Sequence, residues 1–255
     1  MKQNLKPLFF VAFILFYVVS VGQYKLADPL PRDPNVKVGK LANGLTYYIR
    51  KNVKPEKKLE LRLAVNTGSV LENDNQRGLA HFMEHMGFNG SKNFPKNELV
   101  DYLQKTGVEF GADLNAYTSF DETVYILPIP TDDPTVVEKG FTVLEDWAFN
   151  NLFDKNEIEK ERGVVLEESR LSKGSFERMS RQYFPRLFNG SKYAERLPIG
   201  TDDVLKNFKH ETLKSFYKTW YRPNLMAVIV VGDIDPAEAE KKIKAHFSKF
   251  TNPAN

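Results

Sequence analysis

The sequence of 255 residues predicts an α+β sandwich in which helices pack on one side of a mixed β-sheet. Hydrophobic residues make up 42% of the chain, which is enough for a sizeable core. Segments with period-two alternation or short apolar runs predict strands, and longer amphipathic segments predict helices. Their order along the chain, β-β-β-α-α-β-α-α-α-α-β-α, is typical of an α+β fold.

The first part of the domain is predicted to form three strands. Residues 37–41 and 45–50 are two runs joined at Asn43-Gly44, a dipeptide that strongly favours a hairpin turn. Residues 59–65 alternate Leu or Val with other residues and predict a half-buried strand. The polar residues 66–78 that follow predict a loop.

The remainder of the chain predicts mostly helices. They are expected over residues 78–86, 97–106, 134–150, 154–172, 175–187, 211–221 and 236–249. Asp133-Pro134 and Asp154 are suitable residues for starting two of them. Two further strands are expected over residues 123–127, where Pro128 and Pro130 end the run, and over residues 226–231.

The first 22 residues have the features of a secretory signal peptide. Lys2 and Lys6 precede an apolar run over residues 8–21, and Ser20-Val21-Gly22 places small residues where a signal peptidase cleaves. The run is shorter than the roughly 20 residues that a membrane span needs, which favours cleavage before Gln23 over an uncleaved anchor. The expected product is exported to the periplasm; with an uncleaved signal it would be anchored in the membrane.

Composition indicates the domain boundaries and restricts the partners. Residues 23–36 are polar and proline-rich and predict a linker, residues 37–250 one domain, and residues 251–255 a tail. The formal net charge of +3 falls to +1 after loss of the two signal-peptide lysines, so it gives no support for nucleic-acid binding. Because the chain has no cysteine, a tightly bound metal must use His and carboxylate ligands.

The most informative segment is His81-Phe82-Met83-Glu84-His85. Residues four apart on a helix lie about 40° apart around its axis, so the imidazoles of His81 and His85 can converge on one cation. Neutral imidazole suits Zn²⁺, and Glu84 lies beside the pair, where it can take a proton from a metal-activated water. The order is H-x-x-E-H, the reverse of the common zinc-peptidase motif. The alternative is a polar helix face in which Glu84 pairs with the histidines.

A third ligand is expected to be acidic and to come from another element. The helix predicted over residues 154–172 offers five carboxylates, on Glu157, Glu159, Glu161, Glu167 and Glu168. Composition does not choose among them, although Glu161 and Glu168 share a face over two turns. The apolar residues 163–166 between them predict a buried segment, where a carboxylate needs a partner such as a metal. A charged, solvated face is the alternative and suits Glu157 and Glu159.

Three segments of the chain point to a known family when taken together. They are residues 78–86, residues 161–168, and Asn115-Ala116-Tyr117-Thr118 with Thr123-Val124-Tyr125. With these segments the chain resembles the first domain of the pitrilysin/insulinase family of zinc peptidases, especially its bacterial exported members, over about residues 37–250. The resemblance implies a mixed, mostly antiparallel sheet with helices on one side, and a protease that encloses peptides between two halves of a clamshell.

The resemblance also implies roles for single residues. His81, His85 and Glu168 would be the ligands of one Zn²⁺ per chain. Glu84 would be the general base, and Glu161 would orient the ligands without binding the metal itself. The implied activity is that of a zinc-dependent endopeptidase, a hydrolase acting on peptides or unfolded proteins.

Substrate binding is implied for one further segment. Asn115 and Ala116 would belong to an edge that pairs with the substrate backbone.

Family members have two or four such domains, in one chain or in paired subunits, and a later half supplies an Arg and a Tyr that hold the substrate carbonyl. No segment of this chain matches that half, so the expected partner is a second pitrilysin-type domain or subunit. The alternatives to an active peptidase are a non-catalytic partner subunit and an inactive truncated product.

Overall fold

The computed structural model describes residues 31–96, 98–105 and 115–254. Residues Asn35–Asn255 form one compact unit. The predicted signal peptide over residues 1–22 and most of the linker over residues 23–36 lie outside the described residues, and both stay predictions. In the part of the chain that is described, no helix combines the length and the apolar character needed to cross a membrane.

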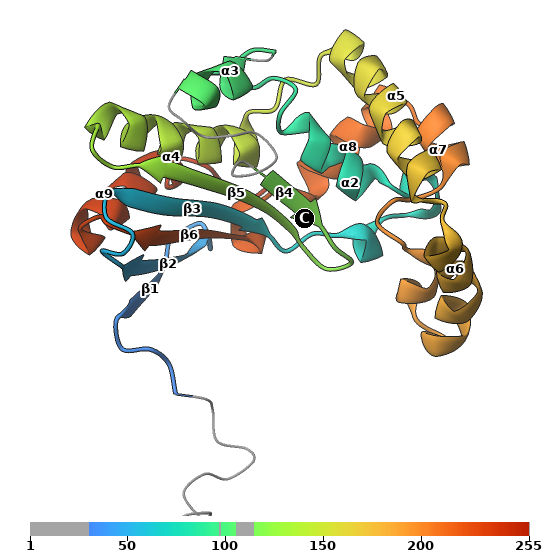
Figure 1. Ribbon diagram of the computed structural model, residues 1–255, viewed down its shortest axis with the longest axis horizontal. Helices are drawn as coiled ribbons and strands as arrows, with labels where there is room; N and C mark the ends of the chain where they lie inside the picture. The colour runs from blue at the N-terminus through green and yellow to red at the C-terminus, as the bar shows by residue number, and fades with distance from the viewer. Residues whose placement is uncertain (1–30, 97, 106–114, 255) are drawn as a thin grey trace, which may run out of the picture. The chain divides into compact units, whose positions relative to one another are not determined.

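A six-stranded mixed sheet forms the centre of this unit, in the order β1-β2-β6-β3-β5-β4 (Figure 1). The strands are β1 (Val36–Lys40), β2 (Thr46–Lys51), β3 (Lys58–Val65), β4 (Asn115–Thr118), β5 (Thr123–Pro130) and β6 (Met226–Gly232). Among them β2 and β6 run parallel, and the other neighbouring pairs are antiparallel. The predicted mixed, mostly antiparallel sheet is confirmed.

Helices cover one face of this sheet, with α4 and α9 over one part and α2 over another (Figure 1). Their bounds are α2 (Leu79–Met86), α3 (Glu98–Lys105), α4 (Pro134–Phe149), α5 (Lys155–Ser172), α6 (Ser175–Leu187), α7 (Asp202–Asn207), α8 (His210–Trp220) and α9 (Pro236–Phe247). The alternating apolar residues of β3 face these helices and are buried; they are Leu59, Leu61, Leu63 and Val65. The period-two pattern in the sequence therefore places the core between sheet and helices.

Side-chain caps start two of the helices where the sequence predicts them. The Asp133 carboxylate accepts the N–H of Thr135 at 2.8 Å, directly before α4. The Asp154 carboxylate accepts the N–H of Asn156 at 2.8 Å and that of Glu157 at 3.2 Å, directly before α5. These caps satisfy N–H groups that have no acceptor inside the helix. The second cap fixes where α5 begins and therefore which of its residues face α2.

The predicted strand boundaries are wrong at one edge of the sheet. The strand expected to end at residue 127 continues to Pro130. Within the described residues β4 pairs only with residues 123–126, so residues 127–130 of β5 have no described partner on that side, where a residue without an N–H is tolerated. The sequence pattern does not predict β4 or α7 as elements, because four and six residues are too few to show a period.

Residues 66–78 form the predicted loop, and part of it is buried. They include two 3₁₀ turns, η1 (Ser69–Leu71) and η2 (Asp74–Gln76). Thr67, Ser69 and Glu72 are 0% exposed. Their polar atoms have partners: the Ser69 hydroxyl, for example, donates to the carbonyl of Arg196 at 2.6 Å. Polar composition does not show which of these residues are buried, because a polar group is buried at little cost once it is hydrogen-bonded.

Candidate metal centre

Helix α2 presents two histidines on one side because its other side belongs to the core. The residues that anchor it are Leu79, Phe82, Met83 and Met86, all with 0% exposure. His81 and His85 therefore share the side that faces α5, which packs against α2. The predicted helix over residues 78–86 is confirmed, and α2 spans Leu79–Met86.

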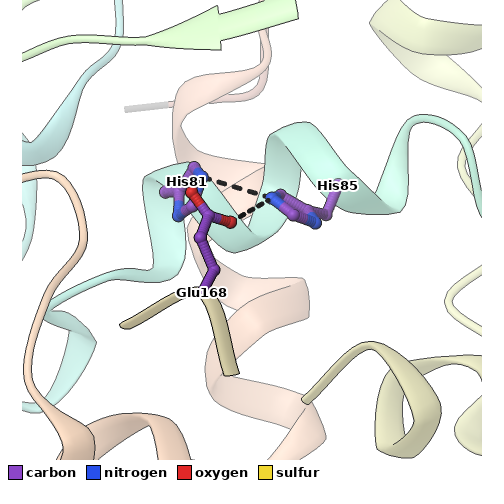
Figure 2. A group of neighbouring side chains, drawn as sticks. All are labelled: His81, His85 and Glu168. Carbon is purple, nitrogen blue, oxygen red and sulfur yellow. Dashed lines mark hydrogen bonds and ion pairs between the residues drawn. The ribbon is translucent and has the colours of Figure 1, made fainter. Parts of the chain in front are cut away.

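The two imidazoles and one carboxylate of α5 point toward one another (Figure 2). The Nε2 atoms of His81 and His85 are 3.2 Å apart. Oε1 of Glu168 lies 3.6 Å from Nε2 of His81, and its Oε2 lies 3.4 Å from Nε2 of His85. One donor atom from each residue fits within 4.8 Å of the others. Two imidazole nitrogens and one carboxylate oxygen are a donor set that fits a zinc ion with one position left open.

The carboxylate of Glu161 fixes the orientation of the His85 ring by contacting Nδ1, the ring nitrogen that does not face His81. Its Oε1 lies 2.6 Å from Nδ1 of His85, and its Oε2 accepts a hydrogen bond from Nδ2 of Asn89 at 2.7 Å. Asn89 also donates to the carbonyl of His85 at 3.0 Å. With Nδ1 engaged, Nε2 of His85 is the nitrogen that faces His81 and Glu168, as expected for a ligand held by an outer carboxylate.

Glu84 lies beside the three donors and is held by strand β4. Its side chain is buried, and Oε2 accepts a hydrogen bond from Oγ1 of Thr118 at 2.6 Å. Oγ1 of Thr118 is also 3.3 Å from Oγ1 of Thr123, so the contact continues into the sheet. Burial raises the pKa of Glu84, and the hydrogen bond from Thr118 partly opposes that rise. A carboxylate with a raised pKa is a better proton acceptor near neutral pH.

A pocket of about 440 Å³ opens over these side chains. Its lining consists of His81, Glu84, His85 and Glu168, residues 115–118 of β4, and Pro198 with Ile199. Strand β4 is the last in the sheet, and no other described strand pairs with its outer edge. Asn115 and Ala116 thus lie where an added extended chain would run beside the histidines.

The five acidic candidates on α5 separate into two groups. Glu161 and Glu168 face the histidines. The other three form ion pairs along α5: Glu157 with Lys160, Glu159 with Arg162 and Glu167 with Arg170. Residues 163–166, between Glu161 and Glu168, are less buried than predicted, since Val164 is 52% exposed. The side chain of Glu168 is itself 48% exposed. Glu168 is oriented by the two histidines and not by an apolar surrounding.

Five residues at or next to this pocket have no role predicted from the sequence. Tyr117 and Thr118 belong to a segment that the resemblance singles out, so their positions held a signal. Asn89 follows α2 by three residues and has no pattern that marks it. Pro198 and Ile199 reach the pocket only through packing of a distant segment, which local periodicity does not predict.

The surroundings of the two imidazoles shift their pKa values in opposite directions. Burial lowers the pKa of His85, but hydrogen bonds with Glu161 and Glu168 outweigh it and raise the pKa to about 9. Burial and the nearby His85 lower the pKa of His81 to about 4. These shifts favour the protonated imidazolium form of His85 beside a neutral His81. Because Zn²⁺ binds neutral imidazole, a metal held by His85 would displace this proton.

We expect zinc binding at pH 7 to release about one proton per chain. Because the proton on His85 competes with the metal below pH 9, the apparent zinc affinity should fall as the pH is lowered toward 5. Titration calorimetry in two buffers with different protonation enthalpies measures the released proton directly. Identical binding heats in the two buffers would show that His85 is neutral before metal binds.

The fold and this donor set are together typical of a metallopeptidase domain, with an H-x-x-E-H helix and an acidic donor from a second helix. The sequence matches the family described as Insulinase (Peptidase family M16) over residues 47–184. It also matches the family described as Peptidase M16 inactive domain over residues 207–255. The chain belongs to the insulinase family of peptidases.

Named relatives agree with this assignment. The probable zinc protease PqqL of Haemophilus influenzae is 39% identical over 238 residues, which is 92% of this chain and 26% of that protein. The first half of the periplasmic protease PqqL from Escherichia coli superposes with a TM-score of 0.84 at 39% identity, covering 89% of this chain and 48% of that one. The ferredoxin protease FusC, solved with Arabidopsis ferredoxin, gives a TM-score of 0.80 at 33% identity over 89% of this chain and 25% of that one. This chain spans about a quarter of the length of the full-length relatives.

Proposed function

We propose that this chain is the zinc-binding catalytic domain of a metalloendopeptidase. The observation that supports this most strongly is the convergence of donor atoms from His81, His85 and Glu168 within 4.8 Å of one another. The buried carboxylate of Glu84 lies next to them with one oxygen hydrogen-bonded. Relatives named as zinc proteases favour Zn²⁺ as the ion.

Each residue has a distinct part in the proposed hydrolysis. His81, His85 and Glu168 would hold Zn²⁺, which supplies a Lewis acid that lowers the pKa of water and polarises a carbonyl. Glu84 accepts the proton of the attacking water and returns it to the leaving amine. Because Oε2 of Glu84 is held by Thr118, its Oε1 is the oxygen left to accept that proton. Glu161 keeps the ring of His85 in place throughout.

The substrate is proposed to bind as an extended strand along β4. The backbone of Asn115 and Ala116 lies at the outer edge of the sheet and lines the same pocket as the histidines. Main-chain hydrogen bonds of this kind give affinity with little dependence on sequence. Peptides and unfolded segments of proteins, which can present a free backbone, are therefore the proposed substrates. The relative FusC, solved with a protein bound, agrees with a polypeptide substrate.

A second pitrilysin-type domain is the proposed partner. Glu168 is 48% exposed, so the donor group lies open to solvent on the side away from α2. Oxyanion stabilisation works best in a site from which water is excluded. The solved PqqL half is about twice as long as the part that this chain covers, which supports a second domain facing the first. The periplasmic relative and the predicted signal peptide favour an exported location.

This proposal predicts that the chain alone is a poor peptidase and that adding a second domain of the family produces metal-dependent cleavage. Orientation of a bound substrate contributes about 7–11 kcal/mol to lowering a barrier, and β4 holds the peptide from one side only. Cleavage of an unfolded fluorogenic peptide would be measured with and without the second domain, then after chelation and zinc restoration. High activity from a demonstrated monomer would contradict the need for a partner, and cleavage that survives chelation would contradict the metal mechanism.

A further inference from the structure

Glu72 is a buried carboxylate at the start of α2 that has no part in the proposed chemistry. It lies between η1 and η2 and is 0% exposed. Its Oε1 accepts the backbone N–H of Gly78 at 3.0 Å and that of Ala80 at 2.8 Å. Its Oε2 also lies 3.0 Å from the N–H of Gly78. Both oxygens therefore face the first turn of the helix that contains the two histidines.

Helix α2 has no cap from its own N-cap residue. That residue is Gly78, which stands at φ +99° and has no side chain. The first N–H groups of any helix have no acceptor within it, and the earliest bond across this turn runs from Phe82 N–H to the Gly78 carbonyl at 3.0 Å. Glu72 replaces the Ser, Thr, Asp or Asn that usually accepts these N–H groups from the cap position.

The capped turn contains a proposed metal ligand. Leu79, Ala80 and His81 are the first three residues of α2, whereas His85 lies in its last turn. A helix of eight residues has little stability of its own, and its ends open first. Loss of the cap would release His81, while His85 remains held by Glu161. The distance between the two imidazoles thus depends on how well the first turn is fixed.

Arg196 holds the backbone that presents Glu72. Its side chain is 6% exposed, and its Nε donates to the carbonyl of Glu72 at 3.1 Å. Its Nη2 donates to the carboxylate of Asp74 at 2.8 Å. In return, the hydroxyl of Ser69 donates to the carbonyl of Arg196 at 2.6 Å. The segment before α2 and the segment around Arg196 are thereby locked to each other.

A glycine contact continues this assembly to the pocket. Gly200 stands at φ +74°, and a Cβ there would lie 2.4 Å from Cα of Gly78. This close approach brings the neighbouring Pro198 and Ile199 to the pocket wall. The cap of α2, its first turn and one wall of the pocket are therefore parts of one packed unit.

We propose that Glu72 is a positioning residue for the metal site: it caps α2 and so holds His81 where it and His85 bind the same ion. The inference rests on the proposed metal site. A carboxylate that only stabilised the fold would change the unfolding temperature and leave the metal affinity of the folded protein as it was. These two roles differ in a measurable way.

The test compares Glu72→Gln with Glu145→Gln in the same chain. Glu145 is also buried, on α4, and pairs with His246 and Lys249 at 2.8 Å each, in the contact with α9. Zinc affinity of the metal-free, folded proteins would be measured by competition with a chromophoric chelator, with the visible spectrum of bound Co²⁺ as a second readout. Both changes should lower the unfolding temperature. Only Glu72→Gln should weaken zinc binding, by about 10–100-fold, and alter the Co²⁺ bands.

Wild-type affinity and an unchanged Co²⁺ spectrum in folded Glu72→Gln protein would overturn the inference. Failure of the unmodified chain to bind zinc would instead contradict the metal site itself, so the two failures are distinct. If circular dichroism shows that Glu72→Gln does not fold, Glu72→Asp takes its place, since it keeps the carboxyl group with a shorter reach. A weakened zinc affinity is expected there too, and an undiminished one overturns the inference equally.

Discussion

Replacement of Glu84 by Gln should leave zinc bound and reduce peptide cleavage by about 10²–10⁴-fold. Gln has nearly the same shape and can still accept the hydrogen bond that Thr118 donates to Glu84 at 2.6 Å. It cannot accept a proton from water at neutral pH. The three proposed ligands are unchanged, so the loss should be in kcat and not in metal content.

The measurement needs the assembly with a second domain, because the chain alone is expected to be nearly inactive. A matched control is Glu167→Gln, which removes an exposed carboxylate of α5 that pairs with Arg170 and stands next to Glu168. The control should keep both zinc and turnover. Undiminished cleavage by the Glu84→Gln protein would exclude Glu84 as the general base.

The combined change His81→Ala and His85→Ala should reduce the zinc content from about one equivalent per chain to trace levels, and activity with it. It removes two of the three donors that lie within 4.8 Å of one another and leaves only Glu168. A single carboxylate exposed to water holds zinc poorly. The control is His246→Ala on α9, where the imidazole pairs with Glu138 and Glu145. Zinc that persists in the double variant would place the metal elsewhere.

The residues on α2 could be predicted from the sequence because their relation is local. His81 and His85 are four apart on a helix whose other side is apolar, and both facts are visible in the sequence. Local spacing does not identify Glu168 as the third donor. Spacing put it on one face with Glu161, and the family resemblance alone separated their roles. In the structure the two carboxylates differ in position: Glu161 contacts Nδ1 of His85, and Glu168 approaches Nε2.

The supporting residues could not be predicted, because their partners are distant in sequence. The sequence predicts only a polar loop over residues 66–78, yet Glu72 is buried there. Its backbone carbonyl accepts a hydrogen bond from the side chain of Arg196, 124 residues later in the chain. Thr118 meets Glu84 only because β4 is the edge strand beside α2. Strand alternation and helix periodicity describe single elements, and these contacts form between elements.

Anomalous diffraction at the zinc absorption edge tests the central claim most directly, with crystals of the unmodified chain prepared without chelators. The account predicts one strong anomalous peak, which marks a zinc ion. The ion should lie about 2.0–2.2 Å from each of three donors: Nε2 of His81, Nε2 of His85 and the carboxylate of Glu168. Glu84 should remain outside bonding distance, still held by Thr118. A peak at another position, or a metal ligated by Glu84 in place of Glu168, would contradict it.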